Sequence, residues 1–170
     1  MILAKNMILA KRCYVVRVLI ALSTGLFLMT ASAADDVPVP PSCTQEVNSR
    51  LAQLIKLGTR QNVDNVMVCG VTARSARPQR PGKHGGHQLL SVRAQLPGIG
   101  TRLVQIAIND ELDGVVTAPA HATVFAYGQA FFDSTGSFVA GIHDVHCSTH
   151  NGADNGWVVV NGKKSPQSCR

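Results

Sequence analysis

Short β-branched and apolar runs, each bounded by Gly, Pro or Asp residues, occupy most of the chain after residue 62. Runs of this kind predict β-strands that are separated by turns. The predicted strands are Asn65–Ala73, Gln88–Gln95, Arg102–Asn109, Ala122–Phe132, Phe138–Cys147 and Trp157–Val160. So many short strands in one small domain favour a curled, mainly antiparallel sheet. We expect an OB-like barrel, with an open sheet as the alternative.

The segment that precedes these strands, SCTQEVNSRLAQLIKLG, has the pattern of an amphipathic helix. Ser42 and Gln45 fit a capping box, and Gly58 is placed to end the helix. Apolar residues recur at helical spacing and form one face, made of Val47, Leu51, Leu54 and Ile55. The sequence therefore predicts a mainly β domain with one N-terminal α-helix that covers its core.

The first 33 residues have the three parts of a secretory signal peptide: a basic start, an apolar run and a small-residue end, Ala31-Ser32-Ala33. A spanning helix needs about 20 largely apolar residues, so we expect cleavage after Ala33 and no membrane span afterwards. Residues 34–41, ADDVPVPP, predict a proline-rich tether. Residues 42–170 then form a single domain, in the periplasm or secreted.

Cleavage would also change the charge of the protein. The leader holds four basic residues and no acidic one, so 16 Lys and Arg become 12, against 10 Asp and Glu, a net charge of +2. This small excess gives nucleic-acid binding weak support. A basic stretch, Arg74 to Lys83, would suit phosphates, but the chain offers few aromatic side chains on which bases could stack.

The cysteines that remain after cleavage are Cys43, Cys69, Cys147 and Cys169. An even number in an exported chain predicts two disulfides. Loop length favours Cys43 with Cys69 and Cys147 with Cys169. Buried free thiols are the less favoured alternative, and a cysteine metal site is disfavoured because no CxxC pair occurs.

Residues 141–151, GIHDVHCSTHN, concentrate three histidines, an aspartate and a cysteine. If 139–147 is a regular strand, Asp144 and His146 point to one face and His143 points to the other. A carboxylate and an imidazole at this spacing can fix a tautomer or approach one ligand. The same pair is also common as a purely structural contact.

The segment KHGGH adds His84 and His87. If this loop folds back, the two imidazoles would join Asp144 and His146 in a set that suits zinc or another divalent metal. Neither HExxH nor a closed cysteine site is present. His150 lies in an Asn- and Gly-rich segment, which predicts an exposed turn.

Common enzyme fingerprints are missing from the sequence. It contains no GxSxG, no GxxxxGK[ST] and no GxGxxG motif. The segment LPGIGTR has two glycines but lies between predicted strands, so it indicates a hairpin turn. Hydrolases with a serine elbow and nucleotide-binding folds are therefore disfavoured.

The region from His87 to Lys164 resembles two groups of uncharacterised bacterial proteins. GIHDVH at 141–146 followed by DNGW at 154–157 is similar to the YukJ-like proteins, although CSTHNG follows here where those proteins have NQGN. HQ at 87–88, Asn109 and NGK at 161–163 are similar to a second family of small exported proteins. The resemblance implies a recurring signature that includes His143, Asp144, His146, Asn155 and Trp157. It carries no activity to transfer.

Two functional hypotheses follow. In the first, the protein is an exported, disulfide-stabilised binding module whose candidate ligand-binding residues are His87, His143, Asp144, His146, Asn155 and Trp157. In the second, it is a metal-assisted hydrolase of the phosphodiesterase or nuclease type. Asp144 and His146, together with His84 or His87, would then position a metal ion or a water molecule.

Overall fold

The computed structural model describes residues 36–78, 86–112, 114–132, 136–149 and 153–169. The predicted signal peptide, His84 and His150 lie outside these residues. The described elements are η1 (Glu46–Asn48), α1 (Ser49–Lys56), β1 (Val63–Thr72), β2 (Arg77–Pro78), β3 (His87–Leu96), β4 (Gly100–Asn109), β5 (Thr123–Phe131), β6 (Phe138–His143), β7 (Trp157–Val160) and β8 (Lys163–Ser165).

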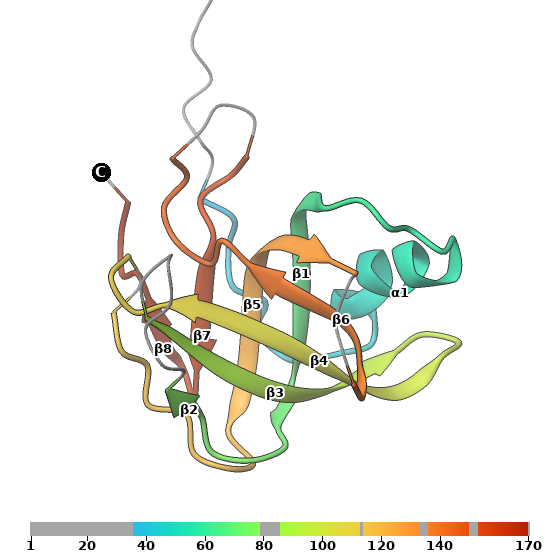
Figure 1. Cartoon of the computed structure of the whole chain (residues 1–170), viewed down its shortest axis with the longest axis horizontal. Helices are drawn as coiled ribbons and strands as arrows, with labels where there is room; N and C mark the ends of the chain where they lie inside the picture. Colours follow the sequence, from blue (N-terminus) through green and yellow to red (C-terminus); the bar gives the residue numbers. More distant parts are fainter. Residues whose placement is uncertain (1–35, 79–85, 113, 133–135, 150–152, 170) are drawn as a thin grey trace, which may run out of the picture. The chain divides into compact units, whose positions relative to one another are not determined.

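A closed five-stranded barrel forms the centre of the domain (Figure 1). Its strands are ordered β1, β3, β4, β6 and β5, and pairing of β5 with β1 closes the ring. All of these pairs are antiparallel except β4 with β6, which run in the same direction. The predicted OB-like barrel with one helix is confirmed. Strands β7 and β8 extend the sheet beyond β5.

The β3–β4 hairpin determines which residues meet at one end of the barrel. Its register runs from Leu96 opposite Gly100, next to the turn, to His87 opposite Asn109 at the far end. Gly98 has a φ of 66° in this turn, so the predicted hairpin at LPGIGTR is confirmed. Because β6 runs parallel to β4, the C-terminal end of β6 lies at the same end of the barrel as His87 and Asn109.

The barrel interior is filled by the apolar side chains that alternate along the strands. Leu51 and Leu54 of α1 are buried against the same core, as the helical pattern predicts. Gly58 follows the helix with a φ of 67°. The predicted capping box is not seen: residues 46–48 form a 3₁₀ turn instead, and Gln45 makes no side-chain cap. The fully buried side chains of the strands include Val66, Val68, Leu90, Val92, Val104, Ile106, Ile142 and Val158.

A second apolar cluster lies around Trp157, whose side chain is fully buried. The ring stacks on Tyr127 with 5.9 Å between centroids, and its Nε1 donates a hydrogen bond of 2.9 Å to the carbonyl of Val37. Trp157 therefore binds the N-terminal segment at Val37 to the sheet.

Both predicted disulfides, Cys43–Cys69 and Cys147–Cys169, are present. Such bonds persist in oxidising compartments outside the cytosol. The first joins the segment before η1 to β1, and the second joins the segment after β6 to the end of the chain. In the described ranges, no helix has the length and apolar character needed to cross a membrane.

Candidate functional site

A cavity of about 220 Å³ lies at the end of the barrel where β3 begins and β4 and β6 end. It is lined by His87, Ala107, Asn109, His143, Asp144 and His146. Three imidazoles and one carboxylate therefore open into a single space, although they come from segments far apart in the sequence. Concave sites with a few converging polar groups are where proteins bind small ligands.

The path of the chain after β6 differs from the sequence prediction. A strand to Cys147 was expected, but β6 ends at His143, and Asp144 takes a left-handed conformation with a φ of 54°. This change of direction breaks the alternation that would turn His143 away from Asp144 and His146. The prediction that His143 points to the opposite face is wrong, because all three residues line the same cavity.

Two glycines allow the backbone to turn at Asp144. A Cβ atom on Gly128 of β5 would collide with the carbonyl oxygen of His143, and one on Gly156 would collide with that of Asp144. The N–H of Gly156 also donates a 2.7 Å hydrogen bond to the carbonyl of His146. A left-handed aspartate costs about 1–2 kcal/mol, so its surroundings must hold it there.

The Asp144 carboxylate lies between two imidazoles. His143 Nδ1 donates to Asp144 Oδ1 over 2.9 Å, and His146 Nε2 lies 3.6 Å from the same oxygen. The hydrogen bond from His143, followed by that from His146, lowers the pKa of the Asp144 carboxyl well below its usual range, although partial burial opposes the shift. Asp144 is therefore ionised at neutral pH.

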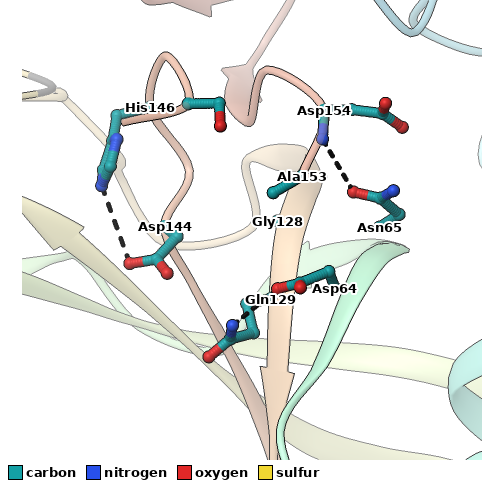
Figure 2. Close-up of a pocket in the computed structure, with 9 residues that line it drawn as sticks. Asp64, Asn65, Gly128, Gln129, Asp144, His146, Ala153 and Asp154 are labelled. Atoms are coloured by element: carbon teal, nitrogen blue, oxygen red, sulfur yellow. Dashed lines mark hydrogen bonds and ion pairs between the residues drawn. The ribbon is translucent and has the colours of Figure 1, made fainter. Parts of the chain in front are cut away.

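His146 is the more deeply placed imidazole, with 11 % of its side chain exposed. Its Nδ1 lies 2.8 Å from the carbonyl oxygen of Cys147. Since a carbonyl can only accept, Nδ1 carries a proton and Nε2 is the nitrogen that faces Asp144. Figure 2 shows the His146 ring turned toward the Asp144 carboxylate.

A second, smaller pocket of about 20 Å³ lies on the other side of Asp144 and His146 (Figure 2). Its polar groups bind one another: Gln129 Nε2 donates to Asp64 Oδ1 over 2.6 Å, and the N–H of Asp154 donates to Asn65 Oδ1 over 3.0 Å. This volume suits a single water molecule. The larger cavity is the better candidate for a ligand.

The structure brings four of the predicted site residues together and places two elsewhere. His87, His143, Asp144 and His146 line the cavity. Asn155 instead accepts a 3.0 Å hydrogen bond from the N–H of Ser148. Trp157 is buried in the second apolar cluster. His84 lies outside the described residues.

The sequence prediction missed two residues of the cavity wall, Asn109 and Ala107, as site residues. Asn109 pairs with His87 across the hairpin. Counting outward from the predicted turn at residues 97–99 would have placed Asn109 opposite His87. The position of the turn therefore contains the information that Asn109 faces His87, but it can be read only once the register of the hairpin is assumed.

Among the described residues, no three His, Cys, Asp or Glu side chains are already arranged so that they could hold a metal ion. What the structure contains is a carboxylate between two imidazoles, with a third imidazole, His87, on the wall of the same cavity.

Comparisons with protein-family models, with curated proteins and with solved structures find no match to this chain. The fold and the cavity are therefore the features from which a function can be inferred.

Proposed function

We propose that this protein is an exported binding module and that the cavity lined by His87, His143, Asp144 and His146 holds its ligand. The observation that carries the proposal is the convergence of three imidazoles and an ionised carboxylate on one space of about 220 Å³. Imidazole and carboxylate groups provide hydrogen bonds, charge and metal-binding atoms. They are the kind of polar groups that fix a ligand in a concave site.

The construction of the turn at Asp144 supports the same conclusion. Two glycines are needed to admit the backbone at this point, and the residue at its centre is held in an unfavourable conformation. Strained residues cluster at binding and catalytic sites, where they persist because the surrounding structure requires them.

Titration followed by ¹H–¹⁵N correlation spectra tests the binding proposal. The probes are zinc chloride, sodium phosphate and a single-stranded oligothymidylate, each added to the purified, oxidised protein. We expect at least one probe to shift the amide signals of Gly86, His87, Asn109 and residues 143–146 in a saturable way. Signals of residues 121–123, at the start of β5, provide the control. If no probe moves the cavity signals, the binding proposal is rejected.

Export is the second part of the proposal, and it is supported by the leader pattern at residues 1–33 and by the two disulfides. The full chain can be expressed in a bacterial host and recovered from its periplasm. Mass spectrometry is expected to show a chain that begins at Ala34 and has no free thiol. Retention of residues 1–33 on a reduced, cytosolic protein would contradict export.

Metal-assisted hydrolysis is a second candidate function, and the position of His87 favours it. His87 lines the same cavity as Asp144 and His146, so the residues that the hydrolase hypothesis names, His84 aside, open into one space. Bis(p-nitrophenyl) phosphate tests it: zinc-saturated protein should release nitrophenol, and His146→Ala should not. Absence of turnover in the zinc-saturated protein rejects this candidate and leaves the binding module unaffected.

Membership in the YukJ-like group, or in the second family of small exported proteins, is also a proposal. It is supported by the motifs at 141–146 and 154–157. Solving the structure of a protein with the same motifs would test it. We expect a closed barrel in which the GIHDxH histidines and aspartate line a cavity at the end of β6.

A further inference from the structure

A further cavity, which we call the β8 cavity, lies between the segment that follows β4 and the strand β8. Its volume is about 280 Å³. The described residues that line it are Gly114, Val115, Val116, Thr117, Val160, Lys163, Lys164, Ser165 and Gln167. It shares no described lining residue with the cavity at Asp144. Three valines give it apolar surface, and the charged residues in this part of its wall are two lysines.

Hydrogen bonds hold both walls of the β8 cavity in place. On one wall, the buried side chain of Gln88 binds the backbone of Val116: Nε2 donates to the Val116 carbonyl over 3.1 Å, and Oε1 accepts from its N–H over 2.7 Å. Next to the other wall, the N–H of Asn161 donates to the carbonyl of Thr123 over 2.9 Å, and Asn161 Oδ1 accepts from the N–H of Thr123 over 3.0 Å. Walls that are already ordered reduce the entropy that a ligand loses on binding.

The two lysines of β8 point to opposite faces of the sheet. Lys163 pairs with Val160 and Lys164 pairs with Val159. Paired residues share a face, and successive residues of a strand alternate between faces. Val160 lines the β8 cavity, so the side chain of Lys163 lies on the cavity side. The ammonium group of Lys164 lies on the other face, 5.9 Å from the centre of the Trp157 ring.

The main chain of Lys164 faces the β8 cavity. Asn161 and Gly162, with φ values of 48° and 82°, form a two-residue turn, which joins Val160 and Lys163 by backbone hydrogen bonds. Hydrogen-bonded and non-hydrogen-bonded pairs alternate along antiparallel strands, so the N–H and C=O of Lys164 point away from β7. Among the described strands, β8 pairs with β7 alone (Figure 1). Lys164 lines the cavity although its side chain lies on the other face, so its main chain forms this part of the wall.

We propose that the β8 cavity binds the C-terminal end of an extended peptide whose last residue is apolar. The terminal carboxylate pairs with the ammonium group of Lys163. The last side chain packs against Val115, Val116 and Val160, and the peptide main chain adds to the edge of β8 at Lys164. This site goes beyond the proposed function, because it uses none of the described residues that line the cavity at Asp144.

The wall of the β8 cavity favours such a peptide in three ways. No described lining residue is acidic, so the lysines attract an anion. Val115 is 77 % exposed, and covering it with an apolar side chain removes apolar surface from water. The third reason is the edge of β8. A free fatty acid would leave the N–H and C=O of Lys164 to water, whereas a peptide strand binds both groups.

Titration of the oxidised protein, followed by ¹H–¹⁵N correlation spectra, tests the inference. The probes are the peptide acetyl-Ser-Thr-Val with a free carboxylate, the same peptide as its C-terminal amide, and sodium hexanoate. We expect the acid peptide to shift the amide signals of residues 115–117 and 163–165 in a saturable way, while the signals of α1 stay in place. The amide should bind about 5-fold more weakly, because it lacks the charge. Hexanoate should also bind about 5-fold more weakly, because it has no main chain to pair with β8.

The two neighbouring lysines provide a matched pair of variants. Lys163→Gln should weaken binding of the acid peptide by about 5-fold, the effect of one exposed charge pair. Lys164→Gln makes the same change of charge on the other face and should leave the affinity almost unchanged at physiological salt, because the solvent screens its charge. Val115→Ser should weaken binding by about 3-fold through loss of apolar contact, and its exposed position keeps the fold unaffected.

Each remaining outcome overturns the inference. If the acid peptide moves none of these signals, the lysines of β8 serve only to keep other chains away from a sheet edge. Hexanoate that binds as tightly as the acid peptide excludes pairing of the peptide main chain with β8. An amide that binds as tightly as the acid, or equal losses in Lys163→Gln and Lys164→Gln, excludes the pairing of the terminal carboxylate with Lys163.

Discussion

The side-chain amide of Asn48 is hydrogen-bonded to both backbone groups of Cys69, a residue 21 positions away. Asn48 Oδ1 accepts from the Cys69 N–H over 2.7 Å, and Nδ2 donates to the Cys69 carbonyl over 3.1 Å. The same Nδ2 donates to the carbonyl of Gln95 over 3.0 Å. One fully buried side chain therefore joins the start of α1 to β1 and β3.

Replacing Asn48 should destabilise the whole domain. In Asn48→Ala the buried N–H and carbonyl of Cys69 lose their partner, and we expect a loss of about 3 kcal/mol in the free energy of unfolding. Urea denaturation followed by Trp157 fluorescence measures it. The control is Asn62→Ala, which removes an exposed side-chain hydrogen bond to Gln129 and should cost less than about 1 kcal/mol. Equal losses in the two variants would refute the bridging role.

The Cys147–Cys169 disulfide should contribute to stability and to the site. Its cysteines are 22 residues apart, and a closed loop of this length is worth about 3 kcal/mol through the entropy of the unfolded chain. The double variant Cys147→Ser/Cys169→Ser is expected to lose about that much in urea denaturation. The affinity of the cavity for any probe that shifts its amide signals should also fall, because the segment after Asp144 is no longer tied to the C-terminal end of the chain. Unchanged affinity would show that the turn at Asp144 does not need this bond.

Gly156 should be intolerant of any side chain. A Cβ atom there meets the carbonyl oxygen of Asp144 and lies 3.0 Å from the backbone nitrogen of His146, so Gly156→Ala has to displace the turn. We expect a loss of about 3 kcal/mol. Gly114→Ala is the matched control: Gly114 has a φ of 71° but open space around it, so strain of about 1 kcal/mol is expected. Thermal unfolding compares them, and similar losses would exclude a steric role for Gly156.

Tyr127 should make the domain sensitive to alkali. Burial, followed by the 2.6 Å hydrogen bond from its hydroxyl to Asp154 Oδ2, raises its pKa well above the ordinary value. The folded state therefore favours the neutral phenol. The contribution of Tyr127 to the free energy of unfolding is fully present below about pH 10, the pKa of a tyrosine in the unfolded chain. It is lost as the pH rises through the higher pKa of Tyr127 in the folded protein.

Near-ultraviolet absorbance can test this shift. The chain has two tyrosines, and Tyr14 belongs to the proposed leader, so in protein that begins at Ala34 the titration reports Tyr127 alone. We expect phenolate to appear only at a pH well above 10, together with unfolding. Tyr127→Phe should reduce the dependence of stability on pH in this range. Ionisation near pH 10 in the folded protein would be incompatible with the buried hydrogen bond.

Local sequence patterns were sufficient to predict most of the fold. Alternating apolar residues and the turn at residues 97–99 predict the strands and the hairpin, and the cysteine spacing predicts both disulfides. The 3₁₀ turn at residues 46–48 was not predictable from capping residues, because Asn48 is held by Cys69 and Gln95. Those partners meet only in the folded barrel.

The three histidines and the aspartate of the candidate site were predictable from the sequence, but their geometry was not. Asp144 and His146 were paired correctly as neighbours, yet His143 was assigned to the wrong face. The alternation rule assumes extended backbone, and Asp144 leaves it with a φ of 54°. The turn is possible because Gly128 and Gly156, which lie elsewhere in the sequence, have no Cβ atom that would collide with its backbone.

The parallel pairing of β4 with β6 has a consequence for how the protein reaches its native state. One wall of the cavity belongs to the β3–β4 hairpin, whereas the wall that contains Asp144 comes from the segment after β6, which follows β5 in the sequence. Contacts between distant parts of a chain form slowly, because a long loop must close before they stabilise anything. An N-terminal fragment that stops before β6 therefore has no binding site. The appearance of ligand binding during refolding should coincide with closure of the barrel.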